Sequence, residues 1–286
     1  MRGASVFAVL TGLLLFTPNA ARCQAPLEFE VASVRPHAAG DDEFISPEFL
    51  SSGRFVSKGS LFQVIAAAYD LLPNRGGRLT GGPDWLRTRS GAIDIQATSV
   101  VPAGLSVQAR NERMRLMLQA LLADRFKLKI RRETKEMPVY ALVVAKGGPK
   151  LQKADIQEKD CSEGAFIATP GTPNTACHSF MGGQVRAIHA RAVDMADVVS
   201  YVANWTDRPL VDKTGIKGLY HIETTPWQPM ELRSSPTPPG AKQDGADVAD
   251  LPTIFEVFEK LGLKMESQRA QVETYVIDHV ERPSEN

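Results

Sequence analysis

Residues 116–144 read LMLQALLADRFKLKIRRETKEMPVYALVV, and this stretch decides the fold class that the sequence predicts. Its first part, LMLQALLADRF, has the apolar spacing of an amphipathic helix. Apolar and charged residues then alternate from Lys127 to Arg132, which is typical of a strand with one solvated face. We expect a turn from Thr134 to Pro138 and a second, apolar strand from Val139 to Val144.

The same order of elements recurs near the C-terminus. The predicted copies are a helix, a strand, a turn and a strand, at Thr253–Leu261, Leu263–Ser267, Gln268–Gln271 and Val272–Val280. Aligned without a gap, Tyr140 meets Tyr275 and Phe126 meets Leu261, an offset of 135 residues (275 − 140). The register holds through the turn and both strands.

An earlier pair of helices keeps nearly the same offset. Leu61 and Val64 of one helix match Met195 and Val198 of the other, and the predicted caps are Ser60 and Asp194. Each helix follows a short predicted strand, Arg54–Ser57 in one case and Val185–His189 in the other. A tandem duplication explains these matches, and chance similarity of short amphipathic elements is the alternative.

These patterns predict an α+β fold with mainly antiparallel sheets and helices packed on one face. We expect two related halves at residues 26–149 and 184–286, each with the order strand, helix, strand, helix, strand, strand. In the second half, Pro209–Asp212 and Leu219–Thr224 are predicted to form a hairpin around Gly215. The stretch Pro226–Leu251 is rich in proline, serine, glycine and aspartate and is predicted to be a long exposed loop.

The N-terminal residues 1–25 are predicted to be a secretory signal peptide. A short basic start precedes the apolar run Val6–Phe16 and then small residues. The run is about 11 residues long, whereas a helix needs roughly 20 to cross a bilayer, so a membrane anchor is disfavoured. Cleavage after Ala21 and cleavage after Ala25 both fit the pattern. Lipid attachment at Cys23 is a third possibility, disfavoured because Arg22 stands where a small residue is needed.

Two cysteines remain after such cleavage, Cys161 and Cys177, both within residues 150–183. An oxidising compartment would pair them into a disulfide that tethers this loop. Closing a loop of about 15 residues would contribute roughly 3 kcal/mol of stability. A metal site that adds His178 is the alternative, but the spacing matches no zinc pattern.

Composition and motifs exclude several classes of function. The chain has 33 basic and 33 acidic residues, so it lacks the positive field that would collect phosphates and we expect no nucleic-acid partner. After the signal peptide, no segment is apolar enough for a stable membrane span. The motifs HExxH, GxSxG and GxGxxG do not occur, so the sequence predicts no metal and no cofactor.

Several stretches together resemble a large paralogous family of exported proteins from soil acidobacteria such as Solibacter. They are FEVASVRPH, LFQVIAAAYDL, GGPDWL, the segment from MLQALLADRF to GGPKL, RPLVDKTGIKGLYHIE and the C-terminal LGLKMESQRAQVETYVIDHVERPSEN. The resemblance covers nearly the whole mature chain and implies a domain of unknown function. Some members of that family carry the domain beside a metallopeptidase of the antibiotic-sensor type, which implies an extracytoplasmic sensing or binding role.

Four residues are the candidate ligand-binding positions. Arg208, Asp212 and Lys213 gather an acid and two bases around a tight turn, although Asp212 would serve equally well as a turn cap. Trp85, in GGPDWL, offers an aromatic face for stacking, or else packs at the edge of the core. No residue stands out as catalytic.

The sequence therefore predicts an exported binding or interaction module, periplasmic or extracellular. Its partner would be another envelope protein or a small extracellular ligand. A secreted hydrolase of envelope or extracellular polymer is one alternative, and it predicts buried titratable residues converging in one pocket. An adaptor that binds through the edge of a sheet is the other, and it predicts an unpaired strand.

Overall fold

The computed structural model describes residues 27–38, 40–50, 52–72, 77–102, 105, 107–161, 177–183, 185–228, 230, 242–243 and 246–283. The predicted signal peptide and residues 162–176 of the tethered loop lie outside these ranges, as does much of the predicted loop Pro226–Leu251. The mixed α+β fold that the sequence predicts is confirmed.

The described helices are α1 (Leu61–Ala68), α2 (Val107–Arg125), α3 (Met195–Val202) and α4 (Ile254–Lys260). The described strands are β1 (Val31–Pro36), β2 (Ile45–Phe49), β3 (Arg54–Ser60), β4 (Leu79–Gly81), β5 (Ala92–Thr98), β6 (Lys129–Val144), β7 (Gln152–Lys153), β8 (His189–Val193), β9 (Leu210–Asp212), β10 (Tyr220–Glu223), β11 (Lys242–Gln243), β12 (Ala246–Asp247) and β13 (Leu263–His279). None of these helices is long and apolar enough to cross a membrane.

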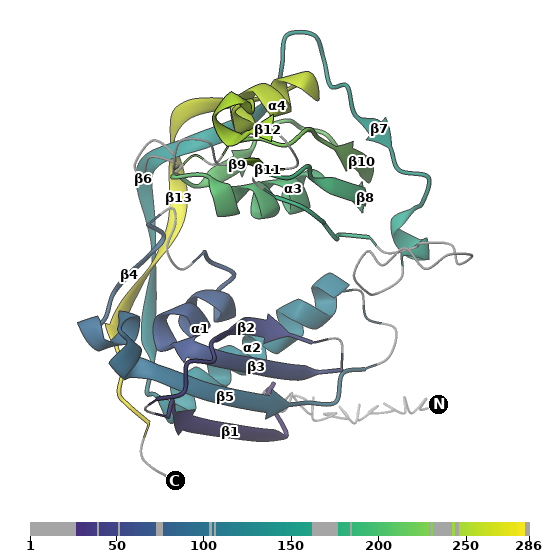
Figure 1. The fold of residues 1–286 in the computed structure, drawn as a ribbon. Helices are drawn as coiled ribbons and strands as arrows, with labels where there is room; N and C mark the ends of the chain where they lie inside the picture. The colour runs from purple at the N-terminus through teal and green to yellow at the C-terminus, as the bar shows by residue number, and fades with distance from the viewer. Residues whose placement is uncertain are drawn as a thin grey trace, which may run out of the picture.

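The first lobe is an antiparallel sheet in the order β1-β5-β3-β2 with α1 and α2 on one face (Figure 1). Helix α1 begins at the predicted cap Ser60, whose hydroxyl accepts a hydrogen bond from the backbone of Gln63. Phe55 and Ile95 of the sheet pack against Leu118 and other apolar residues of α2 in one buried cluster. This burial of apolar surface is what holds the helices on the sheet.

The second lobe has its own core around α3, α4 and the sheet β7-β10-β8 (Figure 1). Helix α3 begins at the predicted cap Asp194, which forms a reciprocal capping box with Asp197. Trp227 is 1% exposed and packs in this core with Val198 and Phe258. Trp227 falls within the stretch predicted as an exposed loop, so that prediction is wrong for this part of it.

Strands β6 and β13 pair antiparallel along their whole length and run from one lobe into the other (Figure 1). The predicted turns at Thr134–Pro138 and Gln268–Gln271 are therefore wrong, because both stretches continue as strand. Their polar composition has a different cause. The middle of the strand pair crosses between the two cores with little covering it, so most of its side chains are exposed or only half-buried.

The two short strands β4 and β9 complete this central sheet, in the order β4-β13-β6-β9, and both pair parallel to their neighbours. The predicted hairpin of residues 209–212 with 219–224 is wrong, because β9 joins β6 whereas β10 joins β7 and β8 in another sheet. Gly215 does adopt the left-handed conformation, φ +70°, but the turn there leads the chain into a different sheet.

The central sheet has a two-fold arrangement. Glu136 of β6 pairs with Gln271 of β13, and these residues are related by the same offset that the sequence comparison gives. Tyr140 lies beside Leu210 of β9, while Tyr275 lies beside Leu79 of β4. Each lobe thus receives strand segments from both halves of the sequence.

Candidate functional site

A cleft of about 460 Å³ lies where the segment from α1 to β4 faces the segment from α3 to β9. Its apolar lining includes Phe49, Leu71, Leu72, Val199, Pro209 and Leu210. Its charged lining consists of Asp70, Arg78, Arg115, Arg208 and Asp212. The two lobes therefore meet in a groove that combines an apolar surface with an excess of guanidinium groups over carboxylates.

The three arginines are held in different ways. Arg115, on α2, pairs with Asp70 just after α1 and with Glu112 at 3.8 Å, and its buried Nε atom has no hydrogen-bond partner among the described residues. Arg78 donates from Nε to the backbone carbonyl of Glu273 at 3.0 Å and forms no ion pair with any residue that the structure describes. A carbonyl fixes the guanidinium without neutralising it, so the charge of Arg78 remains available to a ligand.

Arg208 is fixed mainly by neutral groups, with one longer ion pair. Its Nη1 donates to the hydroxyl of Ser267 at 2.8 Å, and its guanidinium lies 5.2 Å from the centre of the Tyr140 ring. Asp207 approaches its Nε only to 3.7 Å. The sequence singles out Arg208, and the structure places it in the cleft.

Of the other three predicted site residues, Asp212 lines the cleft, whereas Lys213 and Trp85 do not. Asp212 lines the cleft, but its Oδ1 accepts hydrogen bonds from the backbone N–H and the hydroxyl of Thr214, as a turn cap does. Lys213 is not among the residues that line the cleft, and it donates to the side chain of Gln268. Trp85 packs against the first core beneath the guanidinium of Arg282. A ligand-binding role for these residues stays a prediction.

Sequence reasoning missed Arg78 and Arg115. Arg78 follows a glycine-rich stretch, and Arg115 lies in a helix with several other arginines, so neither stands in a recognisable motif. The packing of the two lobes alone brings them to Arg208.

Strand β9 also contributes to this cleft, which Leu210, Asp212 and the preceding Pro209 line. The backbone N–H of Tyr140 donates to the carbonyl of Pro209 at 2.9 Å, and that of Lys213 donates to the carbonyl of Leu142 at 2.8 Å. In a parallel pair, these bonds direct the backbone of alternate residues, 209, 211 and 213, toward β6. The N–H and C=O groups of Leu210 and Asp212 point the other way, and β9 is the last strand of its sheet.

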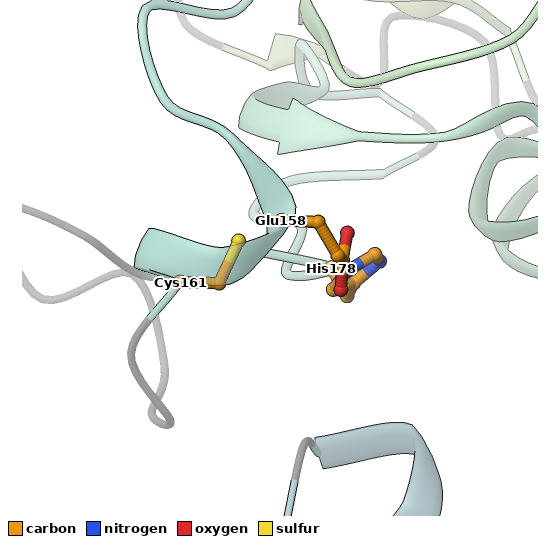
Figure 2. A group of neighbouring side chains, drawn as sticks. All are labelled: Glu158, Cys161 and His178. Atoms are coloured by element: carbon orange, nitrogen blue, oxygen red, sulfur yellow. Dashed lines mark hydrogen bonds and ion pairs between the residues drawn. The ribbon is translucent and has the colours of Figure 1, made fainter.

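A second cluster of ionisable side chains surrounds His178, which follows the disulfide cysteine Cys177. The predicted bond between Cys161 and Cys177 is confirmed. Figure 2 shows the Glu158 carboxylate against the His178 ring. The Nε2 atom of His178 lies 3.0 Å from Glu158 and its Nδ1 lies 2.6 Å from Asp197.

This cluster raises the question of a metal site. Glu158, Cys161 and His178 lie close enough together to hold an ion, but the Cys161 sulfur is bonded to Cys177 and is not a thiolate ligand. Both ring nitrogens of His178 already face carboxylates. The hydrogen bond to Asp197 is the largest cause that raises the pKa of His178, to about 9, so a protonated imidazole between two carboxylates accounts for the cluster.

The chain belongs to the family described as protein of unknown function (DUF3738), whose family model matches residues 62–280. The resemblance to a domain of unknown function is thereby confirmed, whereas an acidobacterial origin and a link to metallopeptidases stay predictions. No curated protein and no solved structure matches the chain.

Proposed function

We propose that this protein is an exported binding module whose cleft between the lobes holds an anionic ligand with an apolar body. The observation that carries the proposal is the convergence of Arg78, Arg115 and Arg208 on one apolar groove. Planar guanidinium groups recognise carboxylates and other oxyanions through paired hydrogen bonds. The apolar walls would bury the remainder of the ligand, as in most small-molecule sites.

The chemistry of the lining favours binding over hydrolysis. A guanidinium keeps its proton at all physiological pH values, so it is no general base. Asp70 is paired with Arg115, and Asp212 is engaged with Thr214. The charged groups of the cleft are therefore arranged to hold a ligand in place.

Export rests on the predicted signal peptide and fits the disulfide, because such bonds persist in oxidising compartments. N-terminal sequencing of protein secreted by a bacterial host tests it. We expect the mature chain to begin after Ala21 or Ala25, and an intact N-terminus on the exported protein would contradict the proposal.

The binding proposal is testable with 8-anilinonaphthalene-1-sulfonate, an anion with an apolar body. We expect its fluorescence to rise on binding to the mature protein. The double variant Arg78→Gln, Arg208→Gln should lose about tenfold or more in affinity, since each lost charge-assisted hydrogen bond contributes about 1.5–3 kcal/mol.

Arg35→Gln is the matched control, because Arg35 is an exposed arginine on β1 that does not line the cleft. Circular dichroism should show that all variants are folded. Equal affinity of the double variant and the control would contradict the proposed site.

A further inference from the structure

We infer that the cleft binds an extended polypeptide segment bearing carboxylate side chains, which adds to the open edge of β9 as a new strand of the central sheet. This inference rests on the proposed function and names the class of ligand. Three features carry it: the unpaired backbone of β9, the apolar groove beside it and the arginines around it.

The first feature is the backbone. The N–H and C=O groups of Leu210 and Asp212 face away from β6 and form no hydrogen bond with another residue that the structure describes. Leu210 is only 7% exposed, so water reaches its groups poorly, whereas Asp212 at the end of the strand is exposed. Buried backbone groups without partners are costly, and an added strand would satisfy them. Addition of a strand to an open sheet edge is a recurrent mode of peptide recognition.

The second feature is the alternation of surfaces that such a strand would meet. Side chains of an extended peptide point alternately to opposite sides. Beside β9 the cleft offers apolar residues of α3, including Val199, and of the α1–β4 segment, including Leu71. Every second side chain of the peptide is therefore expected to be apolar.

The third feature is charge. Arg115 is already paired with Asp70 and Glu112. Arg78, by contrast, carries no ion pair within the described residues, and Arg208 is held mainly by a hydroxyl and a ring, with Asp207 3.7 Å from its Nε. Carboxylates on the remaining side chains of the peptide would complement these groups. A lysine-rich peptide would place like charges against them, so the sign of the charge gives the specificity.

The probe is a fluorescein-labelled, N-acetylated and C-amidated peptide of about eight alternating valine and glutamate residues, the length of a typical strand. A peptide of alternating valine and lysine is the charge control. A valine–glutamate peptide with N-methyl groups on every second residue, made in both alternate phases, is the backbone control, because an N-methyl amide cannot donate to β9.

Fluorescence anisotropy should show binding of the valine–glutamate peptide to the mature protein, with displacement of 8-anilinonaphthalene-1-sulfonate. We expect at least about tenfold weaker binding for the lysine peptide, for both N-methylated peptides and for the double variant Arg78→Gln, Arg208→Gln.

Hydrogen exchange supplies a readout that charge alone would not move. The amides of Leu210 and Asp212 should become protected by about tenfold or more when the peptide binds. The amide of Val211 already faces β6 and should be unchanged. It is therefore an internal control one residue away.

The outcomes separate the two proposals. If the sulfonate binds in the cleft and the peptide neither binds nor displaces it, the proposed function stands and the peptide inference fails. If the N-methylated peptides bind as well as the parent, strand addition is wrong. If neither probe binds, both proposals fail.

The oligomeric state in solution gives one further outcome. A dimer whose interface already protects the amides of Leu210 and Asp212 would show that a second copy of this chain occupies the edge of β9, which also overturns the inference.

Discussion

His178 is the residue at which three parts of the chain meet. Its ring contacts Glu158, which precedes the disulfide, and Asp197 at the start of α3. It also lies 2.9 Å from the side-chain amide of Gln108 on α2, in the other lobe. The residue adopts a left-handed backbone conformation, φ +54°, that only a few side chains tolerate readily. The ionised ring thus links the disulfide loop to α3, while the Gln108 side chain of the other lobe lies against it.

The charge of this ring predicts a pH dependence of stability. The hydrogen bond to Asp197 raises the pKa of His178 in the folded protein from 6.5 to about 9. Its stabilising contribution is therefore complete below pH 6.5 and is lost as the pH rises through 9. We expect the free energy of unfolding to fall by on the order of 2 kcal/mol between pH 6.5 and 9.5, a value discounted because the Glu158 side chain is 56% exposed.

Urea unfolding of the disulfide-bonded protein at both pH values measures this fall. His178→Asn is the matched variant, because asparagine also accepts the left-handed backbone but does not titrate. The variant should lack this part of the pH dependence. The same fall in the variant and in the parent protein would show that another group is responsible.

At the scale of elements, β4 depends on a glycine. Gly81 has φ +79°, and a Cβ atom at this position would lie 2.6 Å from the carbonyl oxygen of Ile277 on β13. Gly81→Ala should therefore disturb the pairing of β4 with β13 and lower the free energy of unfolding by about 2–4 kcal/mol. Gly147→Ala is the control, since its Cβ would meet nothing within 4 Å, and it should shift stability by no more than about 0.5 kcal/mol. Similar urea midpoints for the two variants would contradict this account.

Helix α4 depends on its N-terminal capping box. The hydroxyl of Thr253 accepts from the backbone of Glu256, and the Glu256 carboxylate accepts from the backbone of Thr253. Thr253→Ala should lower the free energy of unfolding by about 1 kcal/mol, whereas Thr253→Ser keeps the acceptor and should change it little. Thermal unfolding of both variants at neutral pH is the measurement, and an equal loss in the two would point to the lost methyl group instead of the cap.

Elements with a local cause were predictable from the sequence. Ser60 and Asp194 cap their helices as their residue types suggest, and Cys161 pairs with Cys177, the two cysteines that the predicted mature chain contains. The predicted turns in β6 and β13 failed because polar residues there reflect exposure between two cores. The parallel pairing of β9 with β6 depends on contacts far apart in sequence, which local patterns do not contain.

The candidate site likewise contains one residue that the local sequence indicates and two that only the packing of distant segments brings in. Arg208 was predictable because it begins a compact group of charged residues around a turn. Arg78 and Arg115 enter the site only because α1, α2 and β4 pack against the second lobe. Similarly, the open edge of β9 is invisible until the order of the sheet is known.

At the scale of the whole molecule, we propose that the two halves arose by duplication of one unit. The central sheet supports this, since β4 lies against β13 as β9 lies against β6, at matching residues. Superposing the pair β4 and β13 on the pair β9 and β6 tests it. Val64 of α1 should then coincide with Val198 of α3, and unrelated positions for the two helices would contradict the duplication. In such an arrangement the cleft is built from two equivalent segments, α1–β4 and α3–β9.

The exchange of strands between lobes predicts a single unfolding transition. Met265 of β13 lies in the second core and Ile277 of the same strand lies in the first, so neither core keeps its packing if the other unfolds.

The three tryptophans allow each lobe to be followed separately. Trp85 reports on the first lobe, and Trp205 and Trp227 report on the second. We expect the fluorescence midpoint in urea to coincide with the circular dichroism midpoint both in Trp85→Phe and in the double variant Trp205→Phe, Trp227→Phe. Each variant is its own control, because the two signals come from one sample. Fluorescence midpoints that fall on opposite sides of the dichroism midpoints would show that the lobes unfold separately, and the long strands would then be a flexible connection between two independent cores.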